Sequence, residues 1–565
     1  MKAASARKPP VVRQGKNLFW WFLILVAGLL AYGNSLRGPF VFDDRLHLLD
    51  QTRLHHLWPM GKVVAETTRP TVDLTLAINY ALGKFNPFGY HLSNLVIHLL
   101  SGLFLFGVVR RTFQTPRLKQ RYEKVADGLA GAVALLWVVH PLNTQAVTYL
   151  IQRSESLMGL FYLLTLYCLI RAAQEPRRLF WKTGAIVSCA LGMGSKAIMV
   201  TAPGMLFLYD ALFLAGSWRE VLRRRGGLYV GLGITWGVLL WSWVLLSKGE
   251  DISVGGAIPG VTAFSYTLTQ PRVILHYLKL SIWPNPLVFD YEWPVVRDVQ
   301  NFLLPGLGVG TLLGLTFWAL MRGTAAGFLG VWFFGVLAPS SSVIPIADCA
   351  FEYRMYLPLI AVVVGLVVGG YEALKKVFGS GRVTQCVAAG AVILWAGILS
   401  GMTFRRNLDY RSEVVLWEDT IQKRPENFRA HHNLARALER EGEWEQAISY
   451  YRQAIRLKTD YAQTYNSLGV ALAHQGRVTE AIEEYRKALG LEPNSADTHN
   501  NLGSAFGQLG QLEDAKKEFE EALKIKPGYA KAHYNLAMAL EMLGRKTEAV
   551  LEYQKAKERG YPPEG

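Results

Sequence analysis

Cysteine is scarce in this chain of 565 residues, which contains only Cys168, Cys189, Cys349 and Cys386. No two of them form a CxxC pair, so the sequence indicates neither a zinc site nor a disulfide framework. A cleavage site of small residues is also missing after the first apolar run, which follows a basic stretch. We therefore interpret this run as an uncleaved membrane anchor.

Segments of about 17–25 apolar residues recur between Leu18 and Met402. Hydrophobic residues make up 51% of the chain, and their concentration in such runs excludes an ordinary soluble protein. From Thr403 onward the composition turns polar and charged. The sequence therefore predicts a membrane half followed by a soluble half.

The net charge of +16 would suggest nucleic acid as the partner of a soluble protein. In this chain much of the excess lies in short loops between apolar segments, as at Arg110-Arg111, Arg177-Arg178 and Arg223–Arg225. That distribution is typical of the positive-inside rule for membrane proteins. We predict contact with membrane lipids and no nucleic-acid partner.

The basic loops also predict the path of the chain. Residues 1–17 form a basic cytoplasmic tail, and residues 18–402 cross the membrane about eleven times. Gln270–Trp283, which Pro271 begins, is ambiguous because it is short for a span. If it lies at the outer interface, the C-terminal half is extracytoplasmic; if it crosses, that half is cytoplasmic. Four segments on the predicted outer side are rich in polar and aromatic residues: 35–90, 140–156, 247–300 and 340–356.

A period of 34 residues organises the C-terminal half. It appears in the alanines Ala447, Ala481, Ala515 and Ala549, and in the aromatic residues Tyr451, Tyr485, Phe519 and Tyr553. The pattern resembles tetratricopeptide repeats, which are pairs of antiparallel helices. Small residues let the two helices approach closely, and the aromatic residue fills the gap between them. We predict a connecting half-repeat over residues 403–426 and four repeats over residues 427–562.

Arrays of such repeats usually grip an extended peptide on a concave face. We predict that recurring asparagines hold the peptide backbone; the alternative is that they are solvated helix residues. These asparagines are Asn433, Asn466, Asn500, Asn501 and Asn535.

Two adjacent acids, Asp43 and Asp44, follow the first apolar segment on the predicted outer side. A carboxylate there can take the proton of an acceptor hydroxyl during sugar transfer. A neighbouring carboxylate raises one pKa of the pair and makes a better base. The alternative is that the two acids form a turn or cap a helix. We predict that the pair is catalytic.

A lipid-linked phosphate needs cations. The candidates on the predicted outer face are Arg69, His91, Arg153, Lys196, Arg272 and Arg354, and the candidates for contacts with sugar or acceptor are Glu155, Asp290 and Glu352. Alternatives stay open: Lys196 snorkels to the interface, Arg354 pairs with Glu352 or Asp348, and His91 is a satisfied interfacial histidine. Oxygen ligands for a divalent cation are limited to a few acids, and we predict no required metal or other cofactor.

At this point the layout resembles the transmembrane-and-tetratricopeptide-repeat O-mannosyltransferases and their bacterial relatives, which belong to the GT-C superfamily. The resemblance rests on the repeats and on several stretches of the membrane half: Phe42-Asp43-Asp44, Arg69-Pro70, Gly89-Tyr90-His91, His140-Pro141, Gln152-Arg153-Ser154-Glu155, Ser195-Lys196, Tyr209-Asp210, Ile344–Asp348 and Glu352–Pro358. Glu352-Tyr353-Arg354 stands where the family has Glu-His-Arg.

The resemblance implies an all-α protein, with a GT-C-type membrane domain and a repeat solenoid. It implies an inverting enzyme of a bacterial cytoplasmic membrane that moves a monosaccharide from a polyprenyl-phosphate donor to Ser or Thr of an extracytoplasmic protein. Asp43 would then be the base, and Asp44 would position it or the acceptor. Two alternatives are a non-enzymatic assembly or transport protein of the envelope or pilus, and a GT-C enzyme with a lipid or glycan acceptor.

Overall fold

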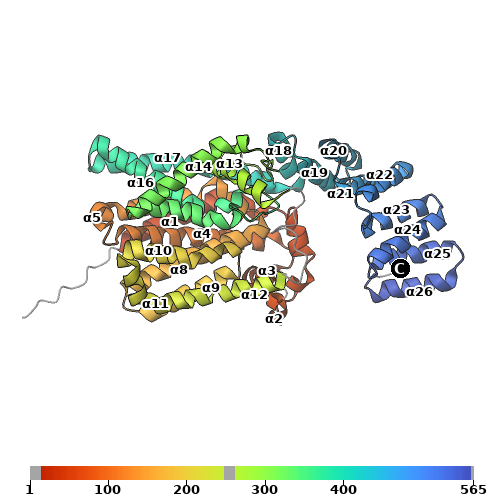
Figure 1. Ribbon diagram of the computed structural model, residues 1–565, viewed down its shortest axis with the longest axis horizontal. Coiled ribbons are helices and arrows are strands. Elements are labelled where there is room, and N and C mark those ends of the chain that lie inside the picture. Colours follow the sequence, from red (N-terminus) through yellow and green to blue (C-terminus); the bar gives the residue numbers. More distant parts are fainter. Residues whose placement is uncertain (1–13, 66, 247–260, 562–565) are drawn as a thin grey trace, which may run out of the picture. The chain divides into compact units, whose positions relative to one another are not determined.

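The computed structural model describes residues 14–65, 67–246 and 261–561. Within these ranges all regular structure is helical, which confirms the predicted all-α fold. Most of the predicted basic tail and residues 247–260 of the third polar segment lie outside the described residues. The chain divides into two compact units, residues 1–412 and 413–565 (Figure 1).

The first unit, which we call the membrane unit, contains thirteen of the helices described below and several shorter ones. The thirteen are α1 (Gln14–Tyr32), α4 (Pro87–Phe113), α6 (Ala126–Val138), α8 (Arg153–Gln174), α9 (Arg178–Met193), α10 (Ala202–Tyr209), α11 (Trp218–Ile234), α12 (Trp236–Leu246), α13 (Ala263–Ile282), α14 (Val299–Met321), α15 (Ala325–Leu337), α16 (Pro358–Phe378) and α17 (Arg382–Asn407). The shorter elements include η2 (Arg45–Leu49), α2 (Met60–Ala65), α3 (Pro70–Gly83), α5 (Lys119–Tyr122), α7 (Thr144–Val147), η6 (Leu150–Gln152), η7 (Ala197–Thr201), η8 (Asp210–Ala215) and η10 (Glu352–Met355).

Seven helical segments in the described ranges are long and apolar enough to cross a membrane, or up to eight if one bent pair counts as a span. They are Leu18–Arg37, Pro87–Phe113, Leu150–Gln174, Ala197–Ala215, Val299–Met321, Pro358–Phe378 and Arg382–Arg411, with Lys119–Val138 and Pro141–Val147 as the bent pair. The predicted number of about eleven crossings is therefore not reproduced by length and composition. Segments such as α9 and α15 form helices of only 16 and 13 residues.

The ambiguous segment around Pro271 is longer than the sequence suggested. Its helix, α13, starts at Ala263, and Thr262 caps it by accepting a hydrogen bond from the Ser265 N–H at 3.1 Å. Pro271 lies inside the helix, so the prediction that it begins the segment is wrong. The Thr-x-x-Ser capping box is the stronger start signal, because the side chains of Thr262 and Ser265 each accept a hydrogen bond from the backbone N–H of the other residue.

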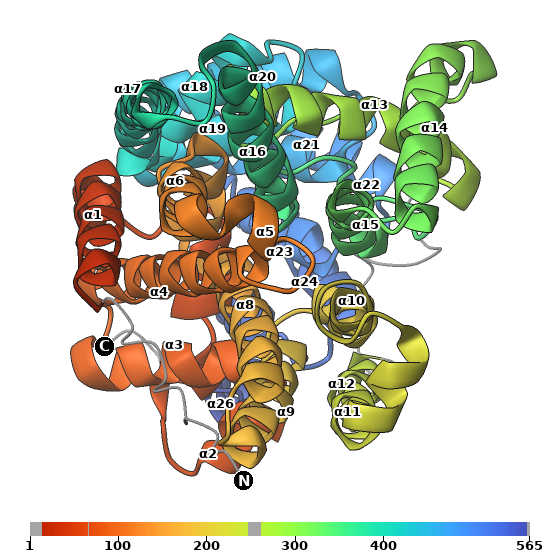
Figure 2. The same ribbon diagram turned by 90° about the vertical axis from the view of Figure 1, so that its left-hand side faces the viewer.

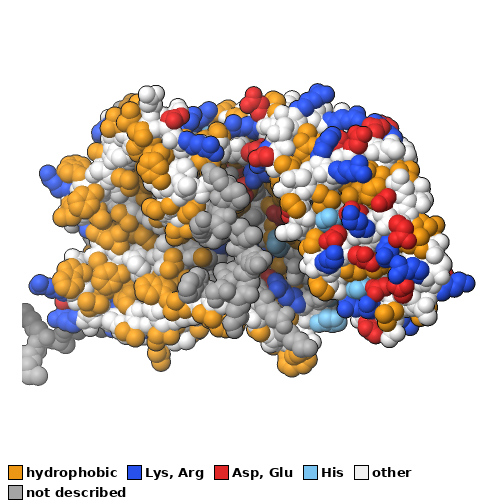
Figure 3. Space-filling model, turned by 45° about the vertical axis from the view of Figure 1, so that its right-hand side comes forward, with side chains coloured by type: hydrophobic (Ala, Val, Ile, Leu, Met, Phe, Trp, Pro, Cys, Tyr) orange, Lys and Arg blue, Asp and Glu red, His pale blue; other side chains and the backbone are white. Residues whose placement is uncertain are grey.

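Helices α4, α6 and α8 form the centre of the membrane unit, where α4 packs against both of the others. Figure 2 shows α17, α15 and α10 of this unit end-on. Trp137 and Tyr162, on α6 and α8, are fully buried in this core. Many large apolar side chains of the unit are exposed, as Figure 3 shows, which suits a lipid environment.

The second unit, which we call the repeat unit, begins with α18 (Glu413–Lys423) and continues as four helical hairpins. The hairpins are α19 (Phe428–Arg440) with α20 (Trp444–Leu457), α21 (Ala462–His474) with α22 (Val478–Leu491), α23 (Ala496–Gln508) with α24 (Leu512–Ile525), and α25 (Ala530–Met542) with α26 (Lys546–Glu558). The division falls after Ser412, and α17 continues to Asn407. Charged side chains cover much of this unit in Figure 3.

Two sets of glycines explain the hairpins of the repeat unit. Gly476 and Gly510 turn the chain between helices with φ angles of +74° and +73°, a region that favours glycine. Gly469 and Gly503 instead allow close approach, because a Cβ on Gly469 would lie 2.5 Å from the Tyr485 ring. The aromatic residue thus fills the gap that the small residue leaves, as the period predicts.

Candidate active site

The acid pair lies on a tight turn that leads into η2. Phe42, just before the pair, has a φ of +49°, which is unusual for a residue with a side chain. Asp44 is fully buried, and its carboxylate accepts hydrogen bonds from the Val41 N–H at 3.0 Å and the Ile151 N–H at 2.8 Å. Asp44 therefore fastens the turn to the segment that starts α8.

Burial raises the pKa of Asp44 to about 8, and the charge of Asp43 adds to this rise. The N–H groups of Val41 and Ile151 act in the opposite direction, since they stabilise the charged form. A carboxyl group that has no exposed surface and holds two backbone N–H groups cannot reach an acceptor hydroxyl without rearrangement. Asp44 is thus a structural acid in this conformation.

Asp43 differs from its neighbour because it is only half-buried. Its backbone N–H donates to the Tyr149 hydroxyl at 3.2 Å. Burial raises the pKa of the Asp43 carboxyl, and the charges of Asp348 and Asp290 contribute to the rise. Tyr149 and His47 oppose it without cancelling it. A carboxylate with a raised pKa and partial exposure is suited to act as a general base.

Two of the predicted phosphate ligands hold the protein together instead. His91 is buried on α4, and its Nε2 donates to the Gly38 carbonyl at 3.0 Å, just upstream of the acid pair. Arg153 is fully buried at the start of α8 and donates to Asn94 and Asn79, each at 2.6 Å. The Arg153 guanidinium also donates to the carbonyls of Tyr90 and Thr75, so its hydrogen bonds in this structure go to protein groups.

The sharpest predicted cation, Lys196, lies beside an acid from another helix. Its Nζ is 2.5 Å from the Glu155 carboxylate of α8 and 4.4 Å from the centre of the Tyr353 ring. Burial lowers the pKa of Lys196, and the nearby guanidiniums of Arg69 and Arg354 lower it further, while Glu155 opposes them. Lys196, Arg69 and Arg354 thus outnumber the two nearby acids, Glu155 and Asp348, and this excess of positive charge suits a phosphate site.

Arg69 joins this group through the backbone. The residues that follow it, Pro70 and Thr71, start α3 and pack against Gly194, whose carbonyl accepts from the Thr71 N–H at 3.0 Å. Arg69 itself is exposed. The structure therefore brings Arg69, Lys196 and Glu155 together from three separate parts of the sequence.

The Glu352–Arg354 stretch supports two loops. Glu352 is fully buried and accepts from the Val288 N–H at 2.6 Å and the Tyr291 hydroxyl at 2.9 Å. Arg354 donates to the carbonyls of Asp348 at 2.6 Å and Cys349 at 2.9 Å. The predicted alternative of an ion pair for Arg354 is thus replaced by bonds to backbone carbonyls. Both side chains shape the site from behind.

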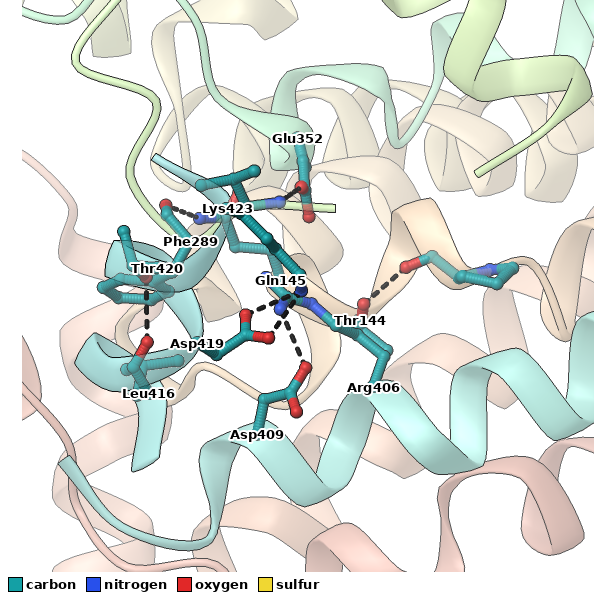
Figure 4. Close-up of polar contacts among 12 residues, drawn as sticks. Thr144, Gln145, Phe289, Glu352, Arg406, Asp409, Leu416, Asp419, Thr420 and Lys423 are labelled. Atoms are coloured by element: carbon teal, nitrogen blue, oxygen red, sulfur yellow. Dashed lines mark hydrogen bonds and ion pairs between the residues drawn. The ribbon is translucent and has the colours of Figure 1, made fainter. Parts of the chain in front are cut away.

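A chain of contacts that the sequence did not single out joins the acid to the cations. Gln145 donates to the Phe289 carbonyl at 3.0 Å (Figure 4). It also accepts from the Tyr353 N–H at 3.1 Å. The Phe289 ring lies 5.1 Å from the ring of Tyr149, the partner of Asp43. Tyr353 in turn contacts Lys196. The only available signal was the run of polar residues after His140 in an otherwise apolar region.

The remaining predicted site residues are less closely tied. Asp290 is buried, lies near enough to Asp43 to raise its pKa, and accepts from the Glu292 N–H at 2.9 Å. Arg272 is exposed on α13. Among the described residues, no group of three or more His, Cys, Asp or Glu side chains is placed to hold a metal ion.

In the repeat unit, the predicted asparagines bond to one another. Asn501 donates to Asn466 at 3.1 Å, and Asn535 donates to Asn500 at 2.9 Å, so each bond joins two successive repeats. Asn500 and Asn535 are buried, whereas Asn433, Asn466 and Asn501 are half-buried. The half-buried residues are the ones that a peptide can reach.

Comparisons with known proteins agree with both units. Residues 67–243 match the family described as dolichyl-phosphate-mannose-protein mannosyltransferase. Residues 414–462, 432–496 and 500–564 match the tetratricopeptide repeat family. The crystal structure of MamA protein matches with 26% identity, 27% of this chain, 85% of that chain and a TM-score of 0.25, a likeness too low to carry an argument.

Several protein O-mannosyl-transferases are similar over most of this chain. Tmtc3 of Drosophila melanogaster is 28% identical over 79% of this chain and 56% of its own length. Human TMTC3 is 24% identical, over 76% and 51% of the two chains, and mouse TMTC4 is 26% identical, over 77% and 66%. The chain thus spans between half and two thirds of the length of these relatives. The matches and the apolar helices support an integral membrane protein related to these transferases, as the resemblance predicts.

Proposed function

We propose that this protein is a membrane mannosyltransferase that modifies proteins. It takes mannose from a polyprenyl-phosphate donor and transfers it to a Ser or Thr hydroxyl of an acceptor held by the repeat unit. The acid pair, the cations and the repeats act on the extracytoplasmic side, and the N-terminus is cytoplasmic. The similarity to named protein O-mannosyl-transferases supports the sugar and the acceptor class.

One observation carries the catalytic part of this proposal: the two adjacent acids have unlike surroundings. Asp43 is half-exposed and has a raised pKa, whereas Asp44 is enclosed and bonded to backbone N–H groups. A base must reach the acceptor proton, so geometry comes before pKa in the choice. Asp43 is therefore the catalytic base, and Asp44 and Tyr149 position it.

The reaction is a single displacement. Asp43 takes the proton of the acceptor hydroxyl while the oxygen of that hydroxyl forms a bond to the anomeric carbon of the sugar. The bond between that carbon and the phosphate oxygen breaks, and the electron pair leaves with the lipid phosphate. Arg69 and Lys196 stabilise the negative charge of the departing phosphate. Attack from the opposite face inverts the anomeric configuration.

The acceptor is held by the repeat unit in this proposal. Asn433, Asn466 and Asn501 contact the peptide backbone, while Asn500 and Asn535 join successive repeats. Because the repeats bind main chain, the acceptor is an extended segment with Ser or Thr residues rather than a single folded epitope.

The decisive variant is Asp43→Asn in proteoliposomes that contain a mannosyl-phosphoryl-polyprenol and a Ser/Thr-rich peptide. We expect the initial rate of transfer to fall by about 100-fold or more, because general-base catalysis contributes about 10²–10⁴ in rate. Asp50→Asn makes the same change at an exposed acid of the same segment and should leave the rate unaltered.

Asp44→Asn sharpens the choice between the two acids. An amide offers only one acceptor oxygen, so one of the N–H groups of Val41 and Ile151 loses its partner, at a cost of about 1–3 kcal/mol in stability. Its rate of transfer, measured on folded protein, should exceed that of Asp43→Asn. Equal rates for Asp43→Asn and wild type would refute the role of Asp43.

A further inference from the structure

The membrane unit contains a second feature, far from the acid pair. A cavity of about 590 Å³ lies among α4, α8, η8, α15 and α16. Its walls are mainly apolar and include Leu105, Phe113, Leu163, Trp332 and Val364. Ligand pockets have volumes of about 300–1,000 Å³, and one water takes only about 30 Å³ of liquid. The space is therefore large enough for a ligand, and its lining favours hydrocarbon.

The cavity belongs to the opposite end of α4 from the candidate active site. His91, near the start of α4, bonds the segment of the acid pair, whereas the lining begins at Leu105 and continues past Phe113. At a rise of about 1.5 Å per residue, Leu105 lies about 20 Å along the helix from His91. A ligand at the acid pair and a ligand in this cavity thus occupy different depths of the membrane.

One residue of the lining is an exposed cation, Arg117. Its guanidinium donates to the Leu212 carbonyl at 3.1 Å and to the Gly323 carbonyl. Carbonyls are neutral, so these bonds orient the guanidinium without cancelling its charge. Three other arginines near this end are bonded to acids: Arg110 to Asp127, Arg111 to Glu175 and Arg121 to Glu372.

We propose that this cavity binds an anionic glycerophospholipid of the membrane. An acyl chain fills the apolar space, and the headgroup phosphate lies against Arg117. Two features favour this occupant. The lining gives an acyl chain an apolar environment. The Arg117 guanidinium is held by carbonyls and forms no ion pair with an acid in the part of the chain that the structure describes, so it attracts negative charge. The hydroxyls of Thr112 and Tyr209, which bond each other at 2.6 Å, place no unsatisfied polar group in the path of the chain.

The glycines of α16 offer a way to fill the cavity. Gly365 and Gly369 line it, and a Cβ on either would meet no atom within 4 Å. A Cβ on Gly370 also meets no atom within 4 Å, but Gly370 is not part of the lining. Gly365→Leu therefore adds bulk inside the cavity, and Gly370→Leu adds the same bulk to the same helix outside it.

The experiment uses the full chain, purified from nanodiscs that contain an equal mixture of phosphatidylglycerol and phosphatidylcholine. Native mass spectrometry counts the retained molecules of each lipid. Wild type and Gly370→Leu should retain phosphatidylglycerol in preference to phosphatidylcholine. Gly365→Leu should lose the retained lipid. Arg117→Gln should show a preference about fivefold lower, whereas Arg117→Lys, which keeps the charge, should show a smaller decrease.

Several results would overturn the proposal. Equal retention by Gly365→Leu and Gly370→Leu would place the lipid elsewhere, and an unaltered preference in Arg117→Gln would remove the charge argument. Displacement of phosphatidylglycerol by a polyprenyl phosphate at equimolar amounts would assign the cavity to the tail of the sugar donor instead. Since the lipid count needs no sugar transfer, it is independent of the proposed enzyme activity.

Discussion

In the membrane unit, the buried acid Glu155 of α8 pairs with Lys196, which lies between α9 and η7 in a different part of the sequence. In the repeat unit, Glu518 pairs with His499 and Glu552 pairs with His533, both at a separation of 19 residues. The first pair occurs once and its partners meet only through the fold. The second recurs because each repeat rebuilds the same hairpin. The unique pair thus depends on the tertiary fold, whereas the recurring pairs follow from the repeated hairpin.

The largest effect should come from breaking the unique pair. Glu155→Gln leaves Lys196 partly buried without its acid, and removal of one partner of a buried pair costs about 3–5 kcal/mol. The measurement is the free energy of unfolding of the full chain in detergent. The double variant with Glu155→Leu and Lys196→Met should recover most of the loss, because it leaves no unpaired charge. A mild effect of Glu155→Gln alone would contradict the pairing.

A larger side chain at a close helix contact should destabilise the repeat unit. Gly469→Leu places side-chain atoms against the Tyr485 ring, and overpacking of this kind costs about 1–3 kcal/mol. Gly507→Ala is the contrasting change, because a Cβ there meets nothing within 4 Å. Alanine is more favourable than glycine inside a helix by about 0.5–1 kcal/mol. Thermal unfolding of the repeat unit, followed in the full chain, should move in opposite directions for the two variants.

Low pH should have a smaller effect on the stability of the repeat unit. Burial raises the pKa of Glu552, but Lys555 and His533 outweigh it, so the folded-state pKa lies below 4.5. A depressed pKa stabilises the fold above the unfolded value and loses this effect as pH falls through the folded value. The loss should stay below about 1 kcal/mol for such a partly exposed pair.

Hydrogen exchange of α25 and α26 measures this loss as the pH falls below 4.5. Glu552→Gln should show a flatter pH dependence than wild type over the same range. An identical pH dependence in the two proteins would mean that the pair with His533 does not stabilise the hairpin.

The smallest effect should come from removing a negative charge near Asp43. The charge of Asp348 contributes to the raised pKa of Asp43, so Asp348→Asn should lower that pKa. The proposed mechanism requires deprotonated Asp43, so the rate of transfer should rise with pH through the pKa of Asp43. The acidic limb of the rate profile should therefore shift to lower pH in the variant. Asp50→Asn, in which an exposed acid is changed, should leave the limb in place.

Sequence reasoning reached some features of the site and missed others. Asp43 and Asp44 are conspicuous because they follow an apolar run, and Lys196 because it ends one. The division of labour inside the acid pair was not visible, since it depends on which carboxylate meets the N–H of Ile151. Arg153 looked like a phosphate ligand, but its surroundings of asparagine and carbonyl oxygens come from α3 and α4.

The amino-acid sequence by itself predicts the two units, the helical fold class and the repeats. These follow from local rules: apolar length, charge between apolar runs, and a period of 34 residues that places small and aromatic residues at fixed positions. Exposure, partners and pKa do not follow from such rules. Tyr149 meets Asp43, Glu155 meets Lys196 and Arg117 meets two carbonyls because packed helices bring distant residues together. Those contacts give Asp43 and Asp44 unlike surroundings, and they arise only in the folded chain.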